Sequence, residues 1–218
     1  MWQQLNTVSS SWVTLVLFLV FVVLVQAYRT HSFESKIFIR FFEFTTYLRI
    51  FGGDREVSRL RSFQIILLFI SVLSYGFLLF FGLYHRGLIA FSGQEYLSLV
   101  LLLSGIVTVR YLVLKGLVWL TDLQTMSNYI VFKNIALNGL FSLFALLYIT
   151  LYSFGPFSTA NMLLYGFVVL GSFHLFFAIY TYSSIFMLGF KPWIYLILYF
   201  CAFKILPWIW VAHSYQLL

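Results

Sequence analysis

Three ionisable side chains fall near the middle of long apolar stretches: Arg110, His174 and Lys204. A charge at the centre of a bilayer costs about 2.5–3.5 kcal/mol on insertion scales, so these residues form a candidate intramembrane polar site. Two cations at membrane depth can act as counter-ions to an anionic small molecule or a lipid head group. A histidine there can relay protons or ligate a metal.

Other interpretations of the same residues stay open. Arg110 can snorkel to the cytoplasmic interface, because its stem is long and Lys115 lies further along the same stretch. Pro207 can kink the helix around Lys204 and open a hydrated crevice. A partner subunit with acidic membrane residues can also supply the counter-charges. We favour snorkelling or local hydration for the cations and a hydrogen-bonded packing role for His174, which has no second histidine or carboxylate spaced to join it.

Signatures of catalysis are missing from the chain. No carboxylate is placed to orient His174, and there is no HExxH helix, no pair of membrane aspartates and no glycine-rich phosphate loop. We therefore expect no enzymatic activity, no cofactor and no metal. Cys201 is the only cysteine, which rules out an intramolecular disulfide, and we expect it to be a small buried hydrophobe.

Small polar residues form two stripes at helical spacing. Asn134, Asn138 and Ser142 recur every four residues, and Ser104 and Thr108 share a face of an earlier apolar stretch. Such stripes are typical of contacts between membrane helices, where small side chains allow close approach and amides bond across. We favour helix packing over a substrate path for both.

The elements that must position these residues are apolar runs. Hydrophobic residues make up 62% of the 218 and charged residues 9%, where a soluble domain carries about 25% charge. Each run approaches the roughly 20 residues of a spanning helix, and none alternates as a barrel strand does. The sequence predicts an all-α polytopic membrane protein, with one domain over residues 1–218 and about six transmembrane helices: Ser11–Tyr28, Ile65–Tyr84, Leu97–Leu120, Ile135–Tyr152, Met162–Leu188 and Trp193–Ala212.

Positive charge is concentrated between the first two runs, in residues 29–61. By the positive-inside rule this loop is cytoplasmic, the first run is an uncleaved anchor, and both termini are non-cytoplasmic. The net charge of +7 then indicates membrane orientation and contact with anionic lipid, and no nucleic acid partner. Within the loop, Phe33–Phe51 has the amphipathic pattern of one helix lying in the membrane interface.

The last run resembles the closing segment of a bacterial multi-span family of unknown function. The similar positions are Tyr199, Cys201, Ile205, Leu206 and Pro207, and the segment around Lys115 is also similar to the family's middle region. This chain has Lys204 where the family pattern has an acidic residue, so no role of that carboxylate transfers here. The resemblance implies a protein of the bacterial cytoplasmic (inner) membrane and no particular activity.

Together these observations favour a non-enzymatic scaffold or accessory subunit of a membrane complex. The alternative is a transporter or binder of an anionic small molecule or lipid that uses Arg110 and Lys204 as counter-ions.

Overall fold

All regular secondary structure in the described part of the chain is helical. The computed structural model describes residues 11–40, 44–51, 62–121, 124–155 and 160–186. Seven helices lie within these ranges: α1 (Ser11–Thr30), α2 (Ser32–Ile39), α3 (Phe44–Phe51), α4 (Ser62–His85), α5 (Gly93–Thr121), α6 (Gln124–Phe154) and α7 (Ala160–Phe186). The prediction of an all-helical protein with membrane-spanning segments is confirmed at this level.

Four of these helices, α1, α4, α5 and α6, are long and apolar enough to cross a membrane. In α7 the segment that qualifies as apolar is shorter, Met162–Phe176. The run Trp193–Ala212 lies outside the described residues, so the structure supports four spans and leaves the count of six as a prediction. The third predicted span is continuous, since α5 passes through Gly105 without a break.

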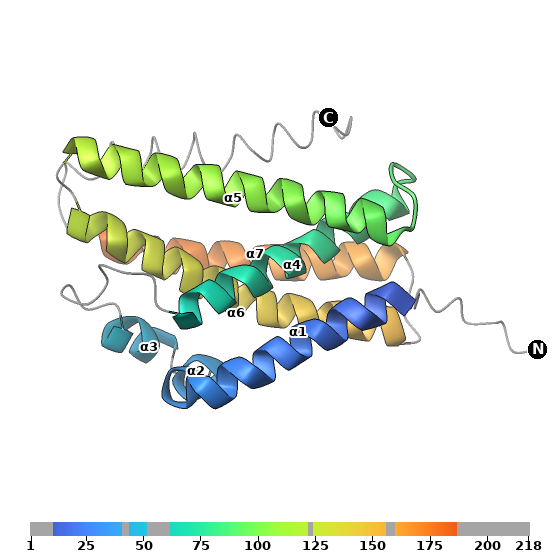
Figure 1. Ribbon diagram of the computed structural model, residues 1–218, viewed down its shortest axis with the longest axis horizontal. Coiled ribbons are helices and arrows are strands. Elements are labelled where there is room, and N and C mark those ends of the chain that lie inside the picture. Colours follow the sequence, from blue (N-terminus) through green and yellow to red (C-terminus); the bar gives the residue numbers. More distant parts are fainter. Residues whose placement is uncertain (1–10, 41–43, 52–61, 122–123, 156–159, 187–218) are drawn as a thin grey trace, which may run out of the picture.

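The long helices run back and forth along one direction, with α4 passing obliquely among the others (Figure 1). α4 packs most extensively against α6, and it also contacts α5, α7 and α1. Burial follows this arrangement: 56% of the α4 span and 61% of the α6 span are buried, against 17% for α1 and 22% for α5. The pair α4–α6 is therefore the centre of the bundle, and α1 and α5 lie outside it.

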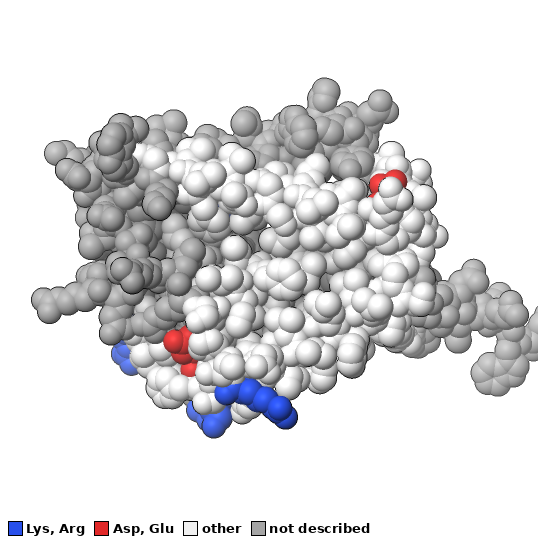
Figure 2. All heavy atoms as spheres, in the orientation of Figure 1, with Lys and Arg blue, Asp and Glu red and all other residues white. Residues whose placement is uncertain are grey.

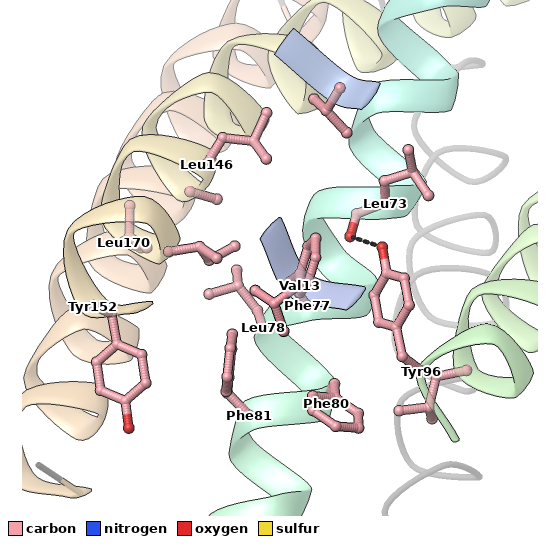
Figure 3. Close-up of a cluster of buried hydrophobic side chains, with 14 of the residues drawn as sticks. Val13, Leu73, Phe77, Leu78, Phe80, Phe81, Tyr96, Leu146, Tyr152 and Leu170 are labelled. Atoms are coloured by element: carbon pink, nitrogen blue, oxygen red, sulfur yellow. Dashed lines mark hydrogen bonds between the residues drawn. The ribbon is translucent and has the colours of Figure 1, made fainter. Parts of the chain in front are cut away.

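Aromatic side chains fill the space between α4 and its neighbours (Figure 3). Phe77 stacks on Tyr96 of α5 with ring centroids 4.4 Å apart. The Tyr96 hydroxyl donates a 3.3 Å hydrogen bond to the carbonyl of Leu73. Close approach of the two backbones depends on Gly76, because a Cβ there would lie 2.8 Å from Cγ2 of Val100. α5 is thus held to α4 by the stacking of buried aromatic rings and by the close backbone approach at Gly76.

Local sequence fixes where these two helices end and begin. The Gly87 backbone is left-handed, with φ of 70°, and its N–H donates to the Tyr84 carbonyl at 2.9 Å. The Leu88 N–H donates to the Leu83 carbonyl at 3.1 Å, which completes a Schellman motif at the end of α4. Ser92 then caps α5, since its hydroxyl oxygen accepts from the Glu95 N–H at 3.2 Å.

The single interfacial helix expected over Phe33–Phe51 is wrong. The structure has two helices of eight residues there, α2 and α3, and Arg40 at the end of α2 has non-helical torsions. Phe38 and Tyr47 explain the break. In one continuous helix these residues would lie about 180° apart around the axis. Their ring centroids are instead 5.1 Å apart, and both side chains are buried in one aromatic cluster, so the chain must fold back between them.

Candidate functional site

A polar cluster joins three helices inside the bundle. We define it as Tyr75 of α4, Arg110 of α5 and Asn138 of α6. The Tyr75 hydroxyl donates a 3.1 Å hydrogen bond to Oδ1 of Asn138. The guanidinium of Arg110 lies within electrostatic range of the same hydroxyl. The positive charge of α5 is therefore close enough to Tyr75 to act on its hydroxyl.

His174 of α7 approaches this cluster through an aromatic ring. Phe141 stacks on Tyr75 with centroids 5.3 Å apart and planes 15° apart. The His174 ring meets the same Phe141 at 4.8 Å and 73°. Phe141 thus contacts both residues, and it is packed against α7 on one side and α4 on the other. Two of the three sequence candidates, Arg110 and His174, are brought into one neighbourhood by Tyr75 and Phe141.

The third candidate, Lys204, lies outside the described residues, as do Cys201 and the C-terminal segment that carries the family resemblance. The structure therefore relates Arg110 to Tyr75 and Asn138, and gives no relation between Arg110 and Lys204.

The two small-residue stripes occupy different environments. Asn134 and Ser142 are buried in α6, and the Ser142 hydroxyl donates to the Asn138 carbonyl at 2.6 Å. On α5, the Ser104 and Thr108 hydroxyls each donate to the carbonyl four residues earlier, both at 2.8 Å. Thr108 is exposed. The α6 stripe faces the interior, whereas Thr108 is on the outer side of the bundle.

Sequence reasoning missed Tyr75, which links the helices of the cluster. A signal was present in the spacing of the second apolar run. Ser71, Ser74 and Tyr75 share one helix face, and both serines are buried with their hydroxyls bonded to α4 carbonyls. A polar stripe of this kind on a span indicates the side that faces other helices, because lipid offers such groups no partner.

A second polar contact lies at the C-terminal end of α4. Nε2 of His85 and the hydroxyl of Tyr152 on α6 form a hydrogen bond. Nearby, the Tyr148 hydroxyl donates to the Met162 carbonyl at 2.5 Å, which ties α6 to the start of α7. The sequence analysis did not predict this link between His85 and α6.

The polar cluster offers one positive charge, amide and phenol hydrogen-bonding groups, and no carboxylate among its three members. This chemistry suits an anionic group better than a cation. Within the ranges that the structure describes, no three residues of the types His, Cys, Asp and Glu are grouped so that they could hold a metal ion.

Comparison with known proteins gives one match. A family model described as a domain of unknown function, DUF4271, matches residues 12–213. Neither the curated proteins nor the solved structures contain a match to this chain.

Proposed function

We propose that this chain, which belongs to the DUF4271 family of unknown function, is a non-enzymatic accessory subunit of a membrane protein complex. Its apolar helices suit an integral membrane protein. We place it in the bacterial cytoplasmic membrane, as the C-terminal resemblance implies. The basic segment is placed on the inside and both termini are placed outside, following the positive-inside rule.

The observation that carries this proposal is the outer face of α5. Small residues and leucines recur on this face at intervals of three or four positions, and all of them are exposed: Leu101, Gly105, Thr108, Leu112 and Gly116. Among the described residues, no atom lies within 4 Å of a Cβ built at either glycine. Small residues between leucines let a second helix approach closely, and such surfaces are typical of helix–helix contacts in membranes. We infer that a transmembrane helix of a partner protein packs here.

The outer face of α1 differs in this respect. Between Leu15 and Val25 its exposed side chains are all bulky; among them Leu15, Phe18 and Phe21 are each more than 60% exposed. Lipid chains solvate such a surface well, and no small residue offers a close approach there. The contrast supports a partner at α5 and lipid at α1.

Purification in mild detergent tests the proposal. Gly105→Leu fills the open position on α5 without an internal clash, so we expect the chain to stay folded and to lose its co-purifying partner. Gly171→Leu is the matched control, because Gly171 of α7 is also exposed with nothing within 4 Å of a Cβ. A wild-type chain that purifies as a lone monomer would contradict the proposal. Loss of the partner only with Gly171→Leu would move the contact to α7.

A second function is favoured by the polar cluster: binding or transport of an anionic small molecule or lipid. Arg110 would supply the counter-charge, and the Asn138 amide would donate hydrogen bonds to the anion. Lys204 belongs to this hypothesis from sequence alone. Arg110→Gln should then abolish binding of an anionic lipid to the purified chain, and Arg110→Lys should restore part of it. Equal binding by all three chains would exclude this function.

A further inference from the structure

The two short helices after α1 form an antiparallel hairpin with a fixed inner face. Phe33 of α2 contacts Phe51 of α3 at 6.0 Å, and Phe38 contacts Tyr47 at 5.1 Å. The hairpin is attached to the bundle at α6, because Tyr47 stacks on Phe132 with centroids 5.7 Å apart. α2 and α3 therefore hold a defined orientation relative to the spans.

The outer face of this hairpin combines positive charge with apolar side chains. Lys36 of α2 and Arg49 of α3 are exposed, as is Arg29 at the end of α1. Among the same helices Ile39 is 58% exposed and Ile50 is 49% exposed. Figure 2 shows basic side chains, with acidic atoms among them, at the end of the molecule that carries α2 and α3, while the visible middle of the bundle is uncharged.

The hairpin lies where a bilayer interface would meet the bundle. α2 begins two residues after α1 ends, and α1 is long and apolar enough to cross the hydrocarbon. Residues directly after a span lie at head-group depth, where lipid phosphates and the upper part of the acyl chains are both within reach.

We propose that the outer face of the α2–α3 hairpin is a binding surface for anionic phospholipid head groups, in which Lys36 and Arg49 contact phosphates while Ile39 and Ile50 enter the acyl boundary. Basic and apolar groups on one surface fit a lipid better than a soluble acidic protein, which would leave the isoleucines in water. Basic groups near an anionic membrane surface each add to binding, and the attraction falls with salt.

The test is lipid retention by the full-length chain in nanodiscs made of phosphatidylcholine mixed with phosphatidylglycerol. Native mass spectrometry measures the phosphatidylglycerol that stays bound. Each basic residue should raise the preference for phosphatidylglycerol over phosphatidylcholine about five-fold. Lys36→Gln combined with Arg49→Gln should therefore lower this preference about thirty-fold. Salt at about 1 M should lower it for the wild type as well. Arg86→Gln, an exposed residue at the other end of α4, is the charge-matched control and should change little.

A depth measurement tests the apolar half separately. An environment-sensitive dye on Ile39→Cys, in a Cys201→Ser background, should be quenched by lipids brominated near the head group. The same dye on Arg86→Cys serves as the exposed reference outside the hairpin. The proposal is overturned if the double variant keeps its preference for phosphatidylglycerol, if Arg86→Gln causes the same loss, or if the Ile39 dye reports water. Loss of a co-purifying protein with unchanged lipid retention would assign this face to a protein partner instead.

Discussion

The Tyr75 hydroxyl on α4 reaches 3.1 Å from Oδ1 of Asn138 on α6 and couples the two most buried spans of the bundle. This contact stands between residues that lie far apart in sequence, and it lies beside the charge of Arg110. It therefore bears both on the stability of the bundle and on the alternative anion-binding function.

The first prediction concerns this hydrogen bond. Asn138→Ala removes the acceptor from a partly buried phenol and should destabilise the protein by about 1–3 kcal/mol. In a double-mutant cycle with Tyr75→Phe, the coupling energy should be about 0.6–1.7 kcal/mol, the range measured for hydrogen bonds between membrane helices. Unfolding by SDS in mixed micelles measures all four free energies. A coupling energy of zero would show that the two groups do not interact.

The second prediction concerns the contact between α6 and α7. Gly166 lies directly against the Tyr148 ring, so that a Cβ there would overlap it. Gly166→Ala should displace this ring, break its hydrogen bond to the Met162 carbonyl and destabilise the protein by about 1–3 kcal/mol. The added methyl of Gly171→Ala on the same helix meets no described residue within 4 Å. This variant should be neutral or stabilising, because alanine is the better helix former. Thermal unfolding in detergent compares the two variants, and equal effects would refute the close contact.

The third prediction concerns Trp12 of α1. Its ring packs on Phe80 at 5.2 Å and on Tyr96 at 5.4 Å, and its buried Nε1 has no hydrogen-bond acceptor among the described residues. Trp12→Phe keeps most of the ring and removes a donor without an acceptor, so it should change stability by less than about 1 kcal/mol. Trp12→Ala should cost about 3–5 kcal/mol. The same SDS titration measures both, and similar losses would mean that the indole N–H has a partner.

The fourth prediction concerns orientation. Lys36 and Arg86 are both exposed; Lys36 belongs to α2, which lies near the start of α4 in Figure 1, and Arg86 directly follows the end of α4. With cysteine at each position in turn, in a Cys201→Ser background, a membrane-impermeant maleimide added to spheroplasts should label position 86 directly. Position 36 should react only after permeabilisation, because the positive-inside rule predicts that the basic segment is cytoplasmic. The reverse pattern would invert the topology.

The apolar runs predicted the long helices well, because hydrocarbon requires a continuous apolar stretch and a helix satisfies its backbone. The run Ile65–Tyr84 lies within α4, which extends past it by a few residues at its start and one at its end. The start of α6 was less predictable. It begins at Gln124 instead of Ile135, since a helix that buries Lys133 and Asn134 against protein need not be apolar there.

The break between α2 and α3 and the polar cluster follow from contacts across the fold. The amphipathic pattern of Phe33–Phe51 is compatible with one helix. Only the packing of Phe38 against Tyr47 and Phe63 makes two helices necessary. In the same way, the sequence identified Asn138 as a packing residue without indicating Tyr75 as its partner. The candidates Arg110 and His174 came from their depth alone. Phe141, which packs between Tyr75 and His174, is an ordinary apolar residue in the sequence.

The hydrogen bond from Tyr75 to Asn138 also implies an order of events during translation. Ser71 and Ser74 bond to carbonyls of their own helix, so their hydroxyls are satisfied as soon as α4 forms. Tyr75 must wait for a residue made 63 positions later, which at about 5–20 residues per second takes about 3–13 s. During that interval α4 has left the ribosome without α6. Until α6 joins α4, the Tyr75 hydroxyl therefore lacks the acceptor that Asn138 provides in the folded protein.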